Sequence, residues 1–283
     1  MIIQWYPGHM TKARREMEQA VKLVDLVIEI VDARIPESSR NPDIDRLAGS
    51  KARLILLNKA DMSDQSVTKL WVDYYKKKGI EAVPLDSRDR GSMKAVRAAL
   101  DRASEKKRER DRRRGILNRP VRAMVAGIPN VGKSTFINSF AGKASAKTGN
   151  KPGVTKGTQW IRLDKNVELL DTPGILWPKF EDDSIGEKLA LIGSVSEEVL
   201  NKEELAVSGL SFLKDRYPGA IAGRYGVEEG EDGPRLLNSI AVARGCLQRG
   251  GEADTEKAAR IILEEFRNGK ICRLSLELPQ EER

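Results

Sequence analysis

The chain reads Gly-Ile-Pro-Asn-Val-Gly-Lys-Ser from Gly127 to Ser134. This segment fits the pattern G-x-x-x-x-G-K-[ST], in which glycines let backbone N–H groups close around phosphate oxygens. A short apolar run precedes it and a helix-type segment follows, which is the context that the pattern requires. We therefore expect a phosphate-binding loop in which Lys133 reaches the β- and γ-phosphates as a catalytic cation and the Ser134 hydroxyl binds Mg²⁺. The loop residues expected to contact the nucleotide are Asn130, Val131, Gly132, Lys133, Ser134 and Thr135.

The chain before residue 175 alternates short apolar runs with helix-type segments. The apolar runs are continuous, as in strands that are buried on both faces. This pattern predicts an α/β fold with a mostly parallel sheet flanked by helices, and it places phosphate ligands at the carboxyl ends of the strands. The expected strands are Asp25–Ala33, Arg53–Leu57, Glu81–Leu85, Val121–Ala126 and Val167–Leu170, and the expected helices are Met10–Leu23, Ser66–Lys78 and Gly91–Lys107.

Helix-type spacing dominates after about residue 180, with Gly and Pro breaks between the segments. A second, α-helical domain is therefore expected. Its predicted helices are Glu187–Val195, Glu197–Tyr217, Leu236–Gln248 and Thr255–Asn268.

A second phosphate-side motif, Asp171-Thr172-Pro173-Gly174, follows the expected strand Val167–Leu170. A carboxylate at Asp171 can hold Mg²⁺ through a water, and the Gly174 N–H can sense a γ-phosphate. Between the two motifs, a polar loop contains Thr155, which is the natural second hydroxyl ligand for Mg²⁺ in a switch-type segment. The sequence thus predicts a hydrolysis site.

A base-reading motif, Asn58-Lys59-Ala60-Asp61, follows the expected strand Arg53–Leu57. The Asp61 carboxylate can accept from both N1–H and the 2-amino group of guanine, whereas adenine would leave it unpaired. Asn58 can meet the opposite base edge and the Lys59 stem can lie along the base plane. Ser87, just beyond the next strand, can offer its backbone N–H to guanine O6. The expected nucleotide is therefore GTP, hydrolysed to GDP and phosphate.

The order of these motifs is unusual, because in ordinary GTPases the phosphate loop precedes the Asn-Lys-x-Asp segment. Here the base reader comes first, which resembles the circularly permuted GTPases. The opening Trp5–Met10, WYPGHM, and Val31–Pro36, VDARIP, look like those of the ribosome biogenesis GTPase A family. The resemblance runs along the whole chain, is specific over residues 1–175 and is weaker beyond.

The resemblance implies a circularly permuted P-loop GTPase domain over residues 1–178 and a helical, RNA-binding domain over residues 179–283. It also implies action on the large ribosomal subunit and its rRNA late in assembly. A packing domain without a ligand of its own remains the alternative for the helical part. Its candidate RNA contacts are Arg244, Arg249, Lys257, Arg260, Arg267, Lys270 and Arg273.

The water-positioning residue is not given by the motifs. Many GTPases use a glutamine after the Asp-x-x-Gly glycine, but here that position is Ile175, which cannot orient water. The family resemblance implies that His9, the single histidine, takes this role. It also implies that Asn130 helps to hold a K⁺ ion near the phosphates, whereas the simpler reading is that Asn130 shapes the loop.

The basic composition favours binding to nucleic acid, and we expect a cytoplasmic protein. Lys and Arg number 50 against 42 Asp and Glu, giving a net charge of +8, and such an excess favours polyanions. The run EKKRERDRRR at Glu105–Arg114 is either part of this basic surface or a solvated helix with internal ion pairs such as Glu105 with Arg108. No apolar run is long enough to span a membrane, and Cys246 and Cys272 lack companion ligands for zinc. We expect a soluble monomer that needs Mg²⁺ and K⁺ and does not bind membranes.

Two function classes follow. The first is a GTPase that assists large-subunit assembly and is stimulated by the subunit. The second is a GTP-dependent RNA-binding switch or scaffold with a non-ribosomal RNA target. Ribosome binding that tightens with a non-hydrolysable GTP analogue favours the first, and nucleotide-independent binding of free RNA favours the second.

Overall fold

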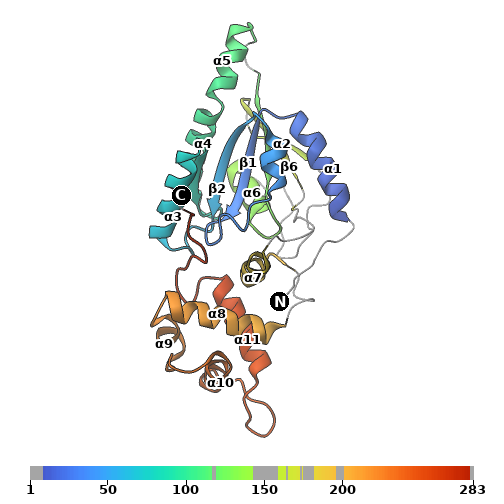
Figure 1. Ribbon diagram of the computed structural model, residues 1–283. Helices are drawn as coiled ribbons and strands as arrows, with labels where there is room; N and C mark the ends of the chain where they lie inside the picture. The colour runs from blue at the N-terminus through green and yellow to red at the C-terminus, as the bar shows by residue number, and fades with distance from the viewer. Residues whose placement is uncertain are drawn as a thin grey trace. The chain divides into compact units, whose positions relative to one another are not determined.

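The computed structural model describes residues 9–116, 119–142, 159–163, 165–172, 174, 182–195 and 201–280, with backbone alone at residues 9–14 and Asp183. The described chain divides into two compact units (Figure 1). One contains residues 182–195 and 201–274. The other contains the described residues from His9 to Gly174 together with the segment from Ser275 to Gln280. The predicted boundary between residues 178 and 179 remains a prediction.

The second of these units, the sheet unit, is built on a six-stranded sheet in the order β3-β2-β1-β4-β6-β5. Neighbouring strands are parallel except for β5, which runs antiparallel to β6. The predicted mostly parallel α/β fold is confirmed. The strands are β1 Leu26–Asp32, β2 Ala52–Asn58, β3 Glu81–Leu85, β4 Val121–Ala126, β5 Gln159–Arg162 and β6 Val167–Asp171.

Helices cover both faces of the sheet, with α2 in front of it and α6 behind it in Figure 1. On one face, apolar residues of α1, α2 and α3 pack against β1, β2, β4 and β6. The central strand β1 is completely buried, which is why it reads as a continuous apolar run. The helices of this unit are α1 His9–Lys22, α2 Asp43–Ala48, α3 Gln65–Lys77, α4 Ser92–Ala103, α5 Glu105–Arg113 and α6 Lys133–Ala141.

The predicted elements differ from the structure by more than a residue at three places in this unit. The predicted helix Gly91–Lys107 is two helices, α4 and α5, because the helix is interrupted at Ser104. Strand β5 was not predicted, since it is a short edge strand with three of its four residues exposed. The six-residue helix α2 was also missed, because so short a segment shows little periodicity.

The helical unit centres on α8, which packs against α7, α9, α10 and α11. Its predicted helical character is confirmed, with an additional short helix α9 that the pattern did not show. The helices are α7 Asp183–Leu191, α8 Lys202–Arg216, α9 Ala220–Tyr225, α10 Gly233–Ala243 and α11 Thr255–Arg267. Among the described residues, no helix combines the length and the apolar character that a bilayer crossing requires.

The last described residues, 275–280, belong to the sheet unit. The Glu277 carboxylate accepts from the backbone N–H groups of Glu37 at 2.5 Å and Ser38 at 3.0 Å, and also from the Ser38 hydroxyl. Trp71 donates its indole N–H to the Glu277 carbonyl at 3.3 Å. The C-terminal segment therefore fastens the loop that follows β1.

Candidate nucleotide-binding site

The phosphate loop leaves β4 after Ala126 and enters α6 at Lys133. Three of its residues have positive φ, Gly127 at 158°, Asn130 at 59° and Gly132 at 99°. A Cβ added to Gly132 would collide with the Asn58 side-chain amide, so only glycine fits there. The loop is thus shaped by close approach to the neighbouring base-reading segment.

Asn58 joins three loops at the carboxyl edge of the sheet. Its Nδ2 donates to the Val131 carbonyl of the phosphate loop at 2.7 Å. Its Oδ1 accepts from the backbone N–H of Ser87 at 3.0 Å and from the Ser87 hydroxyl at 2.7 Å. The expected guanine contacts of Asn58 and Ser87 stay predictions, because these groups bond to each other here.

Lys59 also has a left-handed backbone, with φ at 62°, and its ammonium lies 2.9 Å from Asp32 Oδ2. Asp32 is fully buried at the end of β1 and also pairs with Arg34 at 2.8 Å. Burial alone would raise the pKa of Asp32, but Arg34 and Lys59 hold it below its usual range. This ion cluster fixes the Lys59 stem.

Asp61, the expected reader of guanine, lies against Arg88. Arg88 Nη2 is 2.6 Å from Asp61 Oδ2, while the same guanidinium also bonds Asp86. The other oxygen, Asp61 Oδ1, is buried without a hydrogen-bond partner among the described residues. One oxygen of the carboxylate therefore bonds Arg88, and the other can accept from a ligand.

Lys133 and Asp171 are two buried charges beside the phosphate loop. The Lys133 ammonium donates to the carbonyls of Gly127 and Ile128, each at 3.2 Å. Burial lowers the pKa of Lys133 to about 8, opposed by Asp171. Burial raises the pKa of Asp171 to about 6, opposed by Lys133. A bound ligand of opposite charge would therefore offset the desolvation cost of each charged group.

Gly174 approaches the phosphate loop closely. A Cβ added there would lie 2.8 Å from the Lys133 ammonium and 2.9 Å from the Pro129 nitrogen. Next to Asp171, Thr172 donates its hydroxyl to the Val125 carbonyl at 2.8 Å, which ties the end of β6 to β4. The structure thus brings together the phosphate loop and the second phosphate-side motif.

The remaining predicted residues divide into three groups. Val131 is buried, and Ser134 and Thr135 are half-buried in the first turn of α6. Thr155 and Ile175 lie outside the described residues, and His9 is described only as the first residue of α1. Three candidate RNA contacts already have internal partners: Arg244 pairs with Glu265, Arg260 with Glu256, and Arg267 donates to the carbonyls of Ala190 and Leu191.

Asp32, Arg34 and Arg88 contribute to the site without having been assigned there from sequence. The signal available for the first two was a charged pair directly after a buried strand, at the edge where parallel strands place ligands. For Arg88, only its position beside Ser87 in the third loop pointed to the site.

Comparison with known proteins agrees with this geometry. A family model described as "50S ribosome-binding GTPase" matches residues 122–208. The ribosome biogenesis GTPase A of Bacillus cereus is 47% identical over 282 residues, which cover 99% of this chain and 95% of the relative. The chain belongs to the ribosome biogenesis GTPase A family. It is accordingly a member of a GTPase family, as the sequence motifs predicted.

Other members of the family are similar over the same length. The Priestia megaterium ribosome biogenesis GTPase A is 48% identical and covers 99% of this chain and 98% of the relative. Among solved structures, GNP-bound YlqF from T. maritima superposes with a TM-score of 0.68 at 30% identity, covering 96% of this chain and all of the other. The fold is therefore that of this family.

Proposed function

We propose that this protein hydrolyses GTP on a precursor of the large ribosomal subunit, late in its maturation, and that the subunit accelerates the reaction. The observation that carries the proposal is the junction at Asn58, which fixes the base-reading and phosphate-binding loops to each other. The names of the family model and the relatives, a 50S ribosome-binding GTPase and ribosome biogenesis GTPase A, support the choice of partner. The proposed setting is the cytoplasm, with the protein acting as a monomer.

Each loop has a proposed task in binding GTP. The backbone from Asn130 to Thr135 surrounds the phosphates, and Lys133 neutralises them at the reacting end. Gly174 meets the γ-phosphate from the side of β6. The Asp61 carboxylate selects guanine, because its Oδ1, without a partner among the described residues, can accept from the N1–H and 2-amino edge, where adenine has no donor.

The residues present fit a Mg²⁺ ion. Asp171 Oδ1 is buried and has no hydrogen-bond partner among the described residues, as expected for an oxygen that serves a cation. Ser134 and Thr155 are the proposed hydroxyl ligands. When bound, the ion neutralises charge on the β- and γ-phosphate oxygens.

Two further roles belong to the proposal. His9 orients the attacking water in place of the glutamine that Ile175 replaces, since a neutral imidazole can accept a proton or a hydrogen bond near pH 7. Asn130 helps to hold K⁺ beside the phosphates, where positive charge stabilises the transition state. Replacing K⁺ with Na⁺ should then lower turnover, and equal rates in both salts would remove this role.

The test is GTP turnover with and without purified large ribosomal subunits, in K⁺ buffer, for the wild type and His9→Ala. We expect strong stimulation of the wild type, loss of stimulation in His9→Ala and unchanged nucleotide affinity in both. An unchanged rate with subunits would refute the assembly function and favour the RNA-switch alternative. Stimulation that survives in His9→Ala would keep the partner and exclude the histidine.

A further inference from the structure

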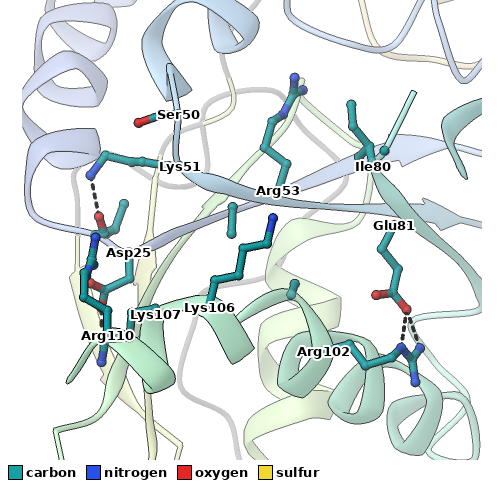
Figure 2. Close-up of a pocket in the computed structure, with 14 residues that line it drawn as sticks. Asp25, Ser50, Lys51, Arg53, Ile80, Glu81, Arg102, Lys106, Lys107 and Arg110 are labelled. Carbon is teal, nitrogen blue, oxygen red and sulfur yellow. Dashed lines mark hydrogen bonds and ion pairs between the residues drawn. The ribbon is translucent and has the colours of Figure 1, made fainter. Parts of the chain in front are cut away.

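A basic recess opens at the amino-terminal edge of the sheet, opposite the edge that carries the nucleotide loops (Figure 2). Its volume is about 630 Å³, and its walls come from the residues that lead into β1, β2 and β3 and from α4 and α5. Six cations and two acids line it, so the lining carries a net positive charge. The lining cations are Lys51, Arg53, Arg102, Lys106, Lys107 and Arg110, and the lining acids are Asp25 and Glu81.

Four of these cations have structural partners. Arg53 bonds the buried Glu29 at 2.9 Å, and Arg102 pairs with Glu81. Lys51 donates to the Val24 carbonyl at 2.6 Å. Lys107, only 7% exposed, pairs with Asp111 at 2.9 Å and also approaches Asp25 at 3.7 Å. These contacts hold the walls of the recess in place.

The Lys107 contact also fixes which side of α5 faces outward. The Lys107 ammonium reaches the carbonyls of Arg119 and Pro120 just before β4, so this side of α5 is held against the sheet edge. Lys106, Arg110 and Arg113, spaced by four and three residues, then share another face of the helix. Figure 2 shows the Lys106 side chain extending from α5 toward β2.

Two other cations of α5 have acidic partners. Arg108 pairs with Asp101 at 2.7 Å and Arg112 pairs with Glu105 at 2.7 Å. The exposed side chains of Lys106, Arg110 and Arg113 make no ion pair with an acid in the part of the chain that the structure describes.

We propose that the recess and the Lys106–Arg110–Arg113 face of α5 bind the phosphate backbone of an RNA. Unpaired Lys and Arg side chains gain free energy from phosphates by releasing the counterions of the nucleic acid. Val24 and Ile80 are the only large apolar side chains in the lining, so the recess suits a polar anion. GTP does not account for this charge, because the nucleotide loops lie at the other edge of the sheet. The inference rests on the proposed function only for the identity of the RNA as that of the subunit precursor.

The test compares two double variants of α5 that remove the same charge. K106Q/R110Q removes two unpaired cations of the recess, and R108Q/R112Q removes two cations that have acidic partners outside it. Affinity for a fluorescein-labelled RNA hairpin of about 16 base pairs is measured by anisotropy from about 50 to 200 mM KCl. We expect K106Q/R110Q to weaken binding about tenfold or more and to lower the salt slope by about 1 to 2. R108Q/R112Q should bind like the wild type.

Equal weakening in both variants would show a general charge effect and overturn the proposal, as would no change in either. Saturable binding of inorganic phosphate that K106Q/R110Q loses, together with unchanged RNA affinity, would mark a small-anion site and also overturn it. Unchanged GDP affinity confirms that the variants are folded. If subunits fail to stimulate the wild type but the hairpin result holds, the assembly function fails and the RNA surface stands.

Discussion

At the scale of single residues, the candidate nucleotide site contains two buried charges. Their desolvation costs free energy that a bound ligand would offset. Lys133 and Asp171 are both buried, and burial shifts each pKa toward the neutral form, to about 8 and about 6 respectively. Keeping both charged near pH 7 costs stability, while phosphate and a divalent cation are the chemical species that compensate them. Affinity for GTP and stability of the free protein therefore oppose each other at these positions.

The first prediction concerns Asp171→Asn. The folded pKa of about 6 lies above the ordinary value of 3.8, so this carboxyl contributes stability that is present below pH 4 and is lost as the pH rises through 6. Without nucleotide and Mg²⁺, the variant should be more stable than the wild type at pH 7.5, by about 1–3 kcal/mol. The gain should shrink toward pH 5. Thermal unfolding at the two pH values measures this, and a variant that is less stable at pH 7.5 would contradict it.

The second prediction concerns Arg88→Ala. Arg88 lies 2.6 Å from Asp61, so binding guanine to that carboxylate must compete with an ion pair. An exposed pair contributes about 0.2–1 kcal/mol, and its removal should strengthen GDP binding up to about fivefold. Fluorescent-nucleotide titration measures the change. Arg90→Ala, with the same charge change in the same loop, should bind GDP like the wild type; weaker binding in Arg88→Ala would mean that Arg88 itself contacts the nucleotide.

At the scale of elements, the parallel strands place the motifs at one edge of the sheet. Asp32 of β1 lies beside Asn58 of β2, which lies beside Leu85 of β3, and Asp171 of β6 lies beside Val125 of β4. The loops that follow these strands are then close enough for single side chains to join them. The C-terminal segment adds a further fastening, through Glu277, to the loop after β1.

The third prediction concerns Glu277→Ala. This change removes a carboxylate that accepts from two backbone N–H groups and the Ser38 hydroxyl, and it leaves those donors without their partner. We expect a loss of about 1–3 kcal/mol of local stability. Hydrogen exchange at the amides of Glu37 and Ser38 should accelerate accordingly. Gln280→Ala, at the exposed end of the segment, is the control, and equal acceleration in both variants would assign the effect to the segment as a whole rather than to Glu277.

At the scale of the whole molecule, the two units have separate cores. The sheet unit buries β1 and its neighbours between helices, whereas the helical unit buries its own apolar residues around α8. The nucleotide loops and the basic recess both belong to the sheet unit, at opposite edges of one sheet. The surfaces proposed for a nucleotide and for RNA therefore lie apart on this unit.

The fourth prediction follows from the separate cores. A ligand that binds only the folded sheet unit stabilises that unit by mass action, by about 2.7 kcal/mol at a concentration of 100 times Kd. Saturating GDP and Mg²⁺ should slow hydrogen exchange in the core of β1 and β4 far more than in α8 and α11. The measurement is exchange followed by mass spectrometry with and without nucleotide. Equal protection in α8 and α11 would mean that the two units unfold as one.

The sequence alone determined the α/β class and the permuted motif order, and it predicted the residues of the candidate nucleotide site. It could do so because a buried parallel strand is a continuous apolar run and a phosphate loop is a local pattern. Its errors fall where local signals are weak. Edge strand β5 is mostly exposed, and the break at Ser104 between α4 and α5 interrupts a helical pattern that otherwise continues.

Only the tertiary structure decided which side chains meet. Asn58 bonds Val131 across 73 positions in the sequence. Arg88 bonds Asp61 across 27 positions, and Glu277 accepts from the Glu37 N–H across 240 positions. The recess likewise combines the starts of three strands with one face of α5, although its cations are scattered from Lys51 to Arg110. Such pairings depend on strand order and helix orientation, which arise from packing of the whole sheet unit and leave no local trace in the chain.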